Sequence, residues 1–560
     1  MNNKLTLSLF VVLLLLQCMV YVLSREISLK DLKKLTKPVK QSCYTYDGVG
    51  VNKKHPTWGS TGEPFPRLTK AAYTDGIKVP PRQKYSAREI SNVFCKQEKC
   101  DDSNKYGLSS MFYAFAQFID HDIDSIGTGI NTESFPIPIP PGDRFTTPTM
   151  PFTRANFASE KQIFIGQPLN QVNQITGYLD CSQIYGSDPI KGRALRLLKG
   201  GLLKYDEKFG LEFLPSAFPH TNGLFFSGGR NQSIVAGDDR VTEALPITSI
   251  QTLFLREHNR LARLLAKRFN VCKSDAKSPK YDEWLYQTAR AINCAQIQSI
   301  TYKEYVPALI GKSHSFNPKK VKFNPDVQVT PSTEFATVAY RFGHSLVSCF
   351  LKRIDENGIE KERVEFKDAF NGFNRFKNSK EELDLILRGL CKHAQQNLDE
   401  KVADGLRDFL FGPNVRFDLA AFNLQRSRDC GIASFNDLRS QLGLKKLTAT
   451  EISNSNSELK QKLVQYYGEE LSDLDPWLGI LMEPKSRDSM LGKLGTKIVK
   501  DQFLKLIKGD PCFYTHRKES WVKQLRKSIE RVTLSDIIVA NTGIKRGDKA
   551  LGSSAFKSKN

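Results

Sequence analysis

The clearest hydrophobic pattern in the chain lies in residues 111–124, which read MFYAFAQFIDHDID. Apolar residues recur there at the three- and four-residue spacing of a buried helix face. On the opposite side Gln117, Asp120 and His121 share one face, because residues three and four apart lie above one another. Asp122 lies one step further round the helix and points elsewhere. The plain interpretation is a solvated charge cluster around a satisfied histidine, and the alternative is a site for chemistry.

Helical periodicity continues along most of the chain, and strand-like alternation is scarce. We expect further helices at residues 247–269, 281–309, 334–350, 380–398 and 457–467. Two stretches rich in glycine, proline or asparagine, one from residue 42 to 82 and one from 130 to 151, predict ordered loops. The pattern therefore predicts a mainly α fold, with one large domain over residues 42–545, long ordered loops and little β-structure.

The two ends of the chain differ from this domain. After Lys4, an uncharged leucine-rich run to residue 23 predicts a secretory signal peptide over residues 1–24. The run is also just long enough for a membrane anchor, which is the alternative. Residues 25–41 are rich in lysine and predict an extended lead-in, and residues 546–560 predict a basic tail.

Charge and cysteine content add a cellular context. The 560 residues include 82 Lys and Arg against 60 Asp and Glu, a formal net charge of +22. A basic secreted protein can adhere to acidic polysaccharides or anionic cell surfaces, although general solubility explains such a charge as well. No nucleic-acid fold or zinc-ligand spacing is apparent, so nucleic acid is not an expected partner. Arg546-Gly547-Asp548 is an adhesion-like tripeptide that we expect to be exposed and available to a cell-surface receptor.

Removal of residues 1–24 would leave ten of the eleven cysteines, an even number that predicts mostly paired thiols in an oxidising compartment. Cys95 and Cys100 are close enough along the chain to close a short loop, and the other pairings stay open. Asn231 begins the single glycosylation sequon, which fits a secretory route.

A second polar stretch is TGYLDCS, residues 176–182, in which hydroxyl and carboxylate oxygens alternate with backbone carbonyls. Hard oxygen ligands at this spacing suit calcium, and the alternative is a turn capped by hydroxyls. Two more stretches pair polar residues at short spacing: Arg240 and Glu243, and then Arg341 and His344 with Gly343 between them. A glycine beside a histidine leaves room for a large flat group to approach.

These stretches, in this order, resemble the animal haem peroxidase family of the peroxidase–cyclooxygenase superfamily. The resemblance covers most of the chain, and its motifs are YDG, HPTWG, SAREISN, QFIDHD, AGDDR, LREHNRLA, YRFGH and NLQRSRD. Each motif alone is weak, and their shared order is highly specific. The lysine-rich lead-in and the basic C-terminus look most like the peroxinectins, which are secreted peroxidases that also act in cell adhesion.

The resemblance implies haem b as cofactor, with His344 as the ligand of the iron and Asn436 as the partner of its second ring nitrogen. His121 would move protons on hydrogen peroxide, and Arg240 would stabilise the negative charge that develops when the O–O bond breaks. Gln117, one helical turn before His121, would hold a water or a peroxide.

The same resemblance assigns the periphery of the cofactor and a metal. Asp120 and Glu243 match the carboxylates that form ester bonds to the haem, and Arg341 and Arg439 match partners of its propionates. One calcium ion would be bound by five residues of the helix and the polar stretch: Asp122, Thr176, Tyr178 through its carbonyl, Asp180 and Ser182.

The function implied is a secreted enzyme that reduces hydrogen peroxide and oxidises small donors. Ala244 stands where some family members have a methionine bonded to the haem as a sulfonium. Because that positive group raises the oxidising power of the iron, its absence predicts bromide, iodide and thiocyanate as good donors and chloride as a poor one. The resemblance implies phenols as donors too. Two alternatives are an adhesion protein that keeps the fold without turnover and a fatty-acid dioxygenase of the cyclooxygenase type.

Overall fold

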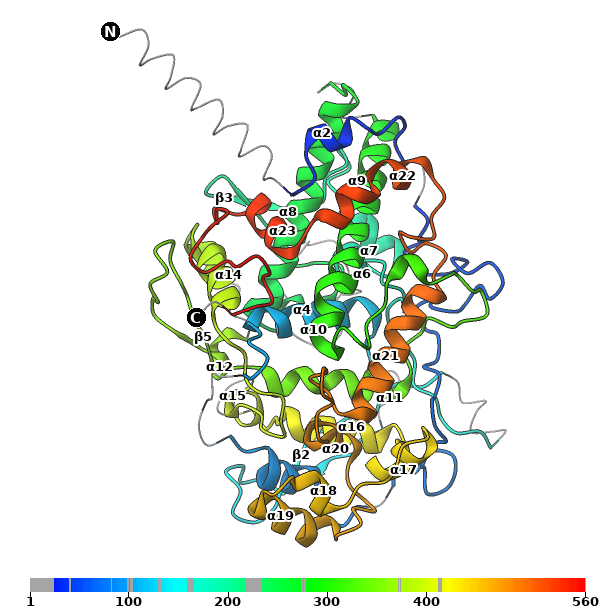
Figure 1. Cartoon of the computed structure of the whole chain (residues 1–560), viewed down its shortest axis with the longest axis vertical. Coiled ribbons are helices and arrows are strands. Elements are labelled where there is room, and N and C mark those ends of the chain that lie inside the picture. Colours follow the sequence, from blue (N-terminus) through cyan, green and yellow to red (C-terminus); the bar gives the residue numbers. More distant parts are fainter. Residues whose placement is uncertain are drawn as a thin grey trace.

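The computed structural model describes residues 25–39, 42–81, 83–97, 100, 104–128, 133–158, 166–216, 234–272, 275, 278–370, 372, 374–410 and 415–558. The predicted signal peptide and the sequon at Asn231 lie outside these residues. Figure 1 shows a mostly helical body, which confirms the predicted fold class. In the part of the chain that is described, the strands form only three short antiparallel pairs.

Three helices form the centre of the molecule: α4 (Ser110–Ile123), α8 (Leu245–Arg268) and α9 (Pro279–Ile300). α8 packs against both of the others. The apolar stripe of α4 faces this contact, where Phe118 stacks on Phe254 of α8 with ring centroids 5.0 Å apart. Burial of aromatic side chains on both helices holds α4 rigidly, so its polar face has a fixed position.

A second group of helices lies on the other side of α4, as the lower half of Figure 1 shows. It comprises α11 (Thr333–Thr337), the 3₁₀ segment η6 (Ala339–Leu346), α16 (Leu419–Asp429) and α20 (Pro476–Met482). η6 contacts α4, α11, α16 and α20. The polar face of α4 therefore looks across at η6.

The remaining elements surround these two groups. The helices are α2 (Leu29–Leu32), α3 (Ala87–Ile90), η1 (Ser91–Cys95), α6 (Ser182–Tyr185), α7 (Pro189–Ala194), η2 (Asp239–Thr242), η4 (Thr301–Tyr305), α10 (Val306–Ile310), η5 (Pro318–Lys320), α12 (Phe366–Ala369), α13 (Asn374–Asn378), α14 (Glu382–Lys392), α15 (Asp404–Arg407), α17 (Phe435–Gln441), α18 (Ala449–Ser453), α19 (Ser457–Tyr467), α21 (Lys493–Lys508), α22 (Ser520–Arg531) and α23 (Leu534–Asn541). The strand pairs are β1 (Ile137–Pro138) with β2 (Thr149–Met150), β3 (Asp206–Lys208) with β4 (Leu211–Phe213), and β5 (Phe350–Leu351) with β6 (Val364–Glu365).

The predicted helices at residues 247–269 and 457–467 correspond closely to α8 and α19, and the one predicted at 380–398 is found as α14, which ends earlier, at Lys392. The expected single helix at 334–350 is instead two short ones, α11 and η6. Val338 separates them with φ −129° and ψ −70°, which is not a helical conformation. The break redirects the chain between the two helices, at the point where it enters the segment that carries His344.

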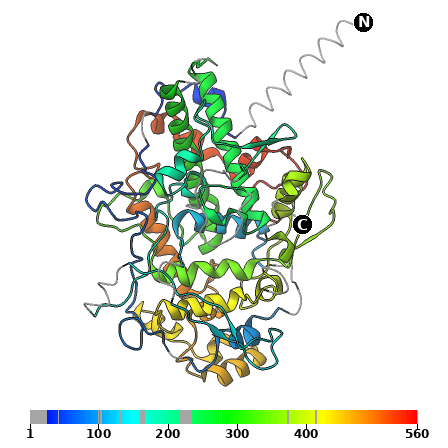
Figure 2. The same ribbon diagram turned by 180° about the vertical axis from the view of Figure 1, so that it is seen from behind.

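Both chain ends pack on the domain in the described part. The lead-in is not extended: its α2 lies against α8 and α22, and Ile27, Leu32 and Leu35 are fully buried. At the other end Phe556 is buried with its ring centroid 5.2 Å from that of Phe115 on α4. Figures 1 and 2 both show this C-terminal segment beside α14.

We predicted that Arg546-Gly547-Asp548 is exposed and can bind a receptor, and this is wrong for Asp548. The side chain of Asp548 is 5% exposed and pairs with Arg388 of α14 at 2.8 Å. Arg546 pairs with Asp536 at 2.7 Å. Both charged side chains of the tripeptide are therefore held by the domain itself, because they neutralise charges on neighbouring helices.

The disulfides are Cys43–Cys512 and Cys100–Cys349 among the described cysteines. The expected Cys95–Cys100 loop is wrong, because Cys95 on η1 is fully buried in the core and has no disulfide. Four other cysteines are buried without a disulfide: Cys181, Cys294, Cys391 and Cys430. Within the described ranges, no helix has the length and apolar content to cross a membrane.

Candidate active site

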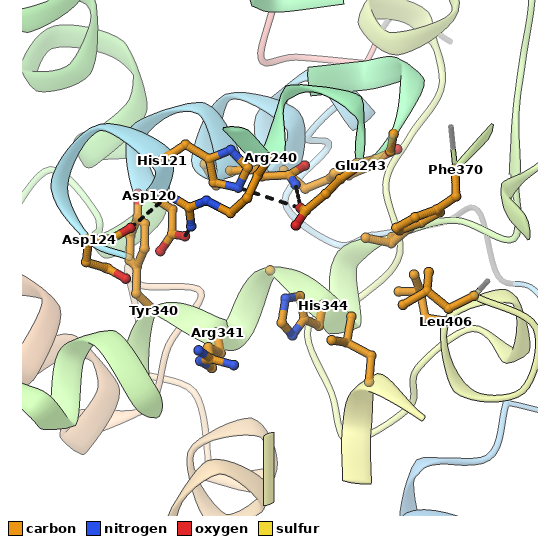
Figure 3. Close-up of a pocket in the computed structure, with 18 of the residues that line it drawn as sticks. Asp120, His121, Asp124, Arg240, Glu243, Tyr340, Arg341, His344, Phe370 and Leu406 are labelled. Atoms are coloured by element: carbon orange, nitrogen blue, oxygen red, sulfur yellow. Dashed lines mark hydrogen bonds and ion pairs between the residues drawn. The ribbon is translucent and has the colours of Figure 1, made fainter. Parts of the chain in front are cut away.

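A cavity of about 300 Å³ lies between α4 and η2 on one side and α11 and η6 on the other (Figure 3). This volume is at the lower end of the range of small-molecule and cofactor sites. One part of its wall is apolar and is formed by Val347, Phe366, Phe370, Leu406, Leu410, Phe417 and Leu419. The rest is polar and charged, so the cavity suits a ligand with a large apolar body and polar edges.

His121 faces the cavity from α4. Its side chain is 3% exposed, and burial together with the nearby Arg240 lowers the pKa of the imidazole to about 3. The ring is therefore neutral at physiological pH. Its Nδ1 lies 3.3 Å from Asp238 without hydrogen-bond geometry, and its Nε2 lies 3.8 Å from Glu243. A neutral buried imidazole with little hydrogen bonding can accept a proton from a ligand.

Arg240 lies beside His121 at the start of η2. Its guanidinium pairs with Asp238 at 2.8 Å and donates to the backbone carbonyl of Asp124 at 3.0 Å. Burial raises the pKa of the Asp238 carboxyl, but Arg240 more than offsets this and lowers it to about 2. The ion pair fixes the guanidinium at the edge of the cavity, where its charge can act on a bound ligand.

Two carboxylates reach the cavity near these groups. Glu243 accepts a hydrogen bond from the amide of Gln117 at 3.0 Å. Asp120 lies 3.6 Å from Arg240, and burial raises the pKa of its carboxyl to about 6 despite that positive charge. The sequence missed Asp124, which is also buried in the cavity wall and whose pKa burial and Asp120 raise well above the usual range.

His344 faces the cavity from η6, on the side opposite His121 (Figure 3). Burial and the charge of Arg341 lower the pKa of this imidazole to about 3, so it too is neutral. A Cβ atom added to the neighbouring Gly343 would meet no atom within 4 Å, so this glycine borders open space. The two neutral histidines thus face one cavity from opposite walls.

The residue that holds His344 is Asn423 on α16. Its amide nitrogen lies 2.7 Å from Nδ1 of His344, and its oxygen accepts a hydrogen bond from Arg341 at 3.0 Å. Arg341 lines the cavity as expected and is held further by the carbonyl of Ala336. Asn423 opens the NLQRSRD motif, so the sequence contained the signal without showing which of its residues reaches the histidine.

The prediction that Asn436 contacts His344 is wrong. Its amide donates to the carbonyls of Leu447 and Glu470 at 2.8 and 2.9 Å, so it holds two backbone segments together. Arg439, one turn further along α17, does not line the cavity either; it is buried and paired with Glu483. Both residues stabilise the packing of α17, because each satisfies buried polar groups there.

The predicted calcium ligands lie together on the far side of α4. Asp122 accepts hydrogen bonds from the backbone nitrogens of Cys181 and Ser182 at 3.1 and 2.6 Å. Asp180 accepts from the hydroxyl of Thr176 at 3.0 Å, and its second oxygen is buried without a partner. The fifth expected ligand, Tyr178, turns its hydroxyl away to Trp58, which leaves only its backbone for a metal.

These two carboxylates repel one another in a site that excludes water. Burial raises the pKa of Asp180 to about 6, and burial and the neighbouring Asp180 raise that of Asp122 well above its usual range. A pair of buried carboxylates with raised pKa values is typical of a site that a cation would neutralise. Oxygen ligands of this kind are those that calcium prefers.

Comparison with known proteins gives the same picture over the whole chain. The family model described as animal haem peroxidase matches residues 43–551. Lactoperoxidase of Mesocricetus auratus is 32% identical over 90% of this chain and 76% of its own. Peroxinectin A of Dictyostelium discoideum is 30% identical over 90% of this chain and 94% of its own.

The solved structure of peroxidase A from Dictyostelium discoideum is similar as well. It superposes with a TM-score of 0.81 at 29% identity, covering 92% of this chain and 100% of that one.

Proposed function

This chain belongs to the animal haem peroxidase family and is a haem-dependent peroxidase, and we propose that the cavity between α4 and η6 is where it works. The observation that supports this most directly is the pair of neutral histidines, His121 and His344, on opposite walls. One can bind a metal ion and the other can move a proton, because both rings keep a free electron pair at physiological pH.

The walls of the cavity fit haem. The apolar side chains suit the body of the macrocycle, Gly343 leaves space beside His344, and Arg341 offers a guanidinium to a propionate. Haem bound there would supply an iron centre that exchanges electrons with hydrogen peroxide. His344 would hold the iron through Nε2, which requires the proton on Nδ1. The amide of Asn423 would then be turned over, so that its oxygen accepts from that proton and no longer accepts from Arg341.

On the other wall His121 would take a proton from one oxygen of the peroxide and return it to the other, so that water can leave. Arg240 keeps its charge throughout, because burial, which lowers the pKa of the guanidinium, is outweighed by its ion pair with Asp238 and by the other nearby carboxylates, which raise it. It would stabilise the negative charge that develops as the O–O bond lengthens. Gln117 is within one turn of His121 and would hold the peroxide or a water.

Asp120 and Glu243 would form ester bonds to the haem. Each ester replaces a C–H bond of a haem methyl group by a C–O bond, an oxidation in which hydrogen peroxide accepts the electrons. Their position in the cavity wall supports this role. Acidified organic solvent should then fail to extract haem from peroxide-treated protein, and free extraction would contradict the ester bonds.

On the far side of α4, Asp122, Thr176, Asp180, Ser182 and the carbonyl of Tyr178 would bind one calcium ion. The clustering of these oxygens and the unpartnered oxygen of Asp180 support this assignment. The bound ion would fix the residue next to His121, and so would hold the catalytic histidine in place.

The proposals for the donors, the cellular compartment and the partners rest on other observations. Ala244 lines the cavity and supplies no sulfonium, so we infer that bromide, iodide, thiocyanate and phenols are the donors. The leucine-rich N-terminus and the two disulfides support secretion. The charge of +22 supports contact with acidic polysaccharides, whereas the paired side chains of Arg546 and Asp548 give no support to receptor binding.

Replacement of His344 by Ala tests the proposal. We expect the purified variant to lose the Soret absorption band of bound haem or to shift it strongly, because among the described residues that line the cavity no other histidine lies on that wall. His314→Ala is the matched control, since His314 is not among the residues lining this cavity and should leave the band unchanged. A Soret band in His344→Ala identical to that of the wild type would refute the assignment.

A further inference from the structure

Two buried thiols meet behind the predicted calcium site. Cys181 lies between the expected ligands Asp180 and Ser182, and Cys294 lies on α9. Sγ of Cys294 donates to the carbonyl oxygen of Asp180 at 3.2 Å, which brings it beside Cys181, and the two thiols lie within hydrogen-bonding reach of one another. Neither is among the disulfides described above. Chain spacing gives no hint of this pair, because more than one hundred residues separate the two cysteines.

The contact is held on both sides. Gln298, one turn after Cys294, donates to the carbonyl of Leu179 at 2.8 Å. Asn293, just before Cys294, donates to the hydroxyl of Tyr185 at 3.0 Å. The segment that carries Cys181 therefore runs along α9 and is fixed to it before and after the pair. Two thiols in such a setting stay close together, which favours a reaction between them over a reaction with any third group.

The backbone of Cys181 adds an independent observation. Its φ is +67°, in the left-handed region that residues other than glycine rarely adopt. Such a conformation persists only where the surroundings fix it, and it is often a sign of a functional constraint. The residue in this conformation is the one whose thiol lies next to that of Cys294 on α9.

We propose that Cys181 and Cys294 are a site of oxidation by hydroperoxides and form a third disulfide. Each thiol gives up its hydrogen and the two sulfurs form one S–S bond, while hydrogen peroxide accepts two electrons and two protons and leaves as two waters. The bond requires the two sulfurs to approach from their present contact to about 2.05 Å.

The bond would join the predicted calcium loop covalently to α9. Because Asp180 and Ser182 flank Cys181, the disulfide would restrict two of the expected metal ligands at once. The oxidant is the peroxide of the proposed function, but the experiment adds peroxide directly. A failure to form the bond therefore leaves the peroxidase assignment intact, and loss of peroxidase activity does not affect the result.

Peptide mapping of the intact protein tests the proposal. The full-length holoprotein is treated with hydrogen peroxide, the peroxide is removed, and the protein is unfolded in an alkylating agent and digested with trypsin without reduction. Cleavage after lysine and arginine releases peptides 162–191 and 291–303, which contain Cys181 and Cys294 as their only cysteines. We expect one linked species, lighter by two hydrogens than the sum of the two peptides, and loss of both alkylated peptides.

Three variants give the controls. Cys181→Ala and Cys294→Ala should each abolish the linked species and leave the other cysteine fully alkylated. Cys391→Ala, which removes another buried thiol without a disulfide, should keep the link. Full alkylation of both cysteines in peroxide-treated wild type would overturn the proposal, and so would a link from either cysteine to a different partner. The wild-type map decides the question even if a variant fails to fold.

A second measurement uses stability. Wild type oxidised by peroxide should unfold at a higher temperature than the same protein carrying these two thiols reduced, because the bond constrains the unfolded chain. In Cys294→Ala this shift should be lost, whereas in Cys391→Ala it should persist. An equal shift in Cys294→Ala would show that another oxidation causes it and would count against the disulfide.

Discussion

The buried carboxylates on the two sides of α4 have different partners. On the cavity side the carboxylates of Asp120 and Asp238 lie beside Arg240, and an open volume adjoins them. On the loop side Asp122 and Asp180 are fully buried with hydroxyl groups and backbone nitrogens as their hydrogen-bond partners. Consecutive residues 120–122 thus contribute to two sites: an open one in which arginine side chains lie beside the carboxylates, and a closed one in which hydroxyl groups and backbone nitrogens bond to them.

This difference indicates which kind of ligand each side can bind. An open cavity with a partly apolar wall, in which arginines already accompany the carboxylates, suits a large organic cofactor held by many weak contacts. A closed site with excess negative charge is costly unless a cation enters, because water cannot solvate the carboxylates. The comparison also implies that changes on one side should leave the ligand of the other side in place.

The largest expected effect on the cavity side comes from His121→Ala. We expect the reaction with peroxide to slow by about 10²–10⁴-fold, the range typical of a positioned acid–base group. Haem and calcium should both stay bound, since the loop side is untouched. Stopped-flow absorption measures the rate, and metal analysis measures calcium. A wild-type rate in this variant would remove His121 from the mechanism.

The pH dependence of the same rate sharpens the test. The pKa of His121 is about 3, against about 6.5 for an ordinary histidine, so its ring stays neutral as the pH falls from 7 to 5. The rate constant should therefore show no inflection near pH 6.5. The same shift makes the stability of the fold depend on pH. As the pH drops from about 6.5 toward 3, His121 is protonated in the unfolded chain but not in the folded one, so the free energy of unfolding falls.

On the loop side, removal of calcium by a chelator should destabilise the protein by on the order of 3–5 kcal/mol, the cost of leaving buried charge uncompensated. Because the pKa of Asp180 is raised to about 6, the metal-free fold holds protons that the unfolded chain has lost, so its stability should fall as the pH rises from about 4 to 7. Thermal unfolding at pH 5 and 7, with and without chelator, measures this. Asp122→Asn, which alters an expected calcium ligand, should reduce the effect of the chelator, whereas the control Asp437→Asn, which changes an exposed carboxylate, should keep it. Equal stability with and without chelator at pH 7 would contradict the calcium site.

We expect a smaller effect on haem binding from a substitution at one of two asparagines, and none from the other. Asn423→Ala removes the partner of His344 and should weaken haem binding about 10- to 100-fold, as loss of such a supporting hydrogen bond does at metal sites. Asn436→Ala should lower thermal stability and leave the haem spectrum unchanged, because its bonds join backbone segments of another region. The opposite result for the two variants would restore the sequence-based assignment.

The smallest effect concerns donor choice. Ala244→Met places a sulfur at the cavity wall, where a sulfonium link to the haem would raise its oxidising power. We expect the ratio of chloride to bromide turnover to rise in this variant, with bromide turnover nearly constant. Steady-state assays at equal halide concentration measure the ratio. Wild-type chloride turnover equal to that of bromide would contradict the argument from Ala244.

Sequence patterns were most informative where spacing alone decides geometry. The three- and four-residue spacing placed Gln117, Asp120 and His121 on one side of α4 and Asp122 on the other, and the structure brings the first three to the cavity. Ordered motifs likewise identified Arg240 and His344 as residues to examine, and both line the same cavity.

Such patterns do not predict which residues far apart in the sequence come into contact. Asn423 and Asn436 lie on neighbouring helices in similar polar motifs, and only the path of the chain between α16 and α17 decides which one meets His344. Cys95 is a second example. It is close to Cys100 in the sequence, but that closeness does not show in which direction the side chain of Cys95 points from η1. The packed lead-in and C-terminal segment were missed because lysine-rich surface positions conceal a few apolar anchors such as Leu32 and Phe556.

The burial of Phe556 against Phe115 has a consequence for the order in which the protein is made. The ribosome releases α4 early, but the ring that covers the back of this helix belongs to Phe556, which is synthesised hundreds of residues later. Cys512 likewise closes its bond to Cys43 only after most of the polypeptide has been synthesised. The cavity can therefore reach its final shape only once translation of the domain is nearly complete, so capture of a cofactor should follow synthesis and not accompany it.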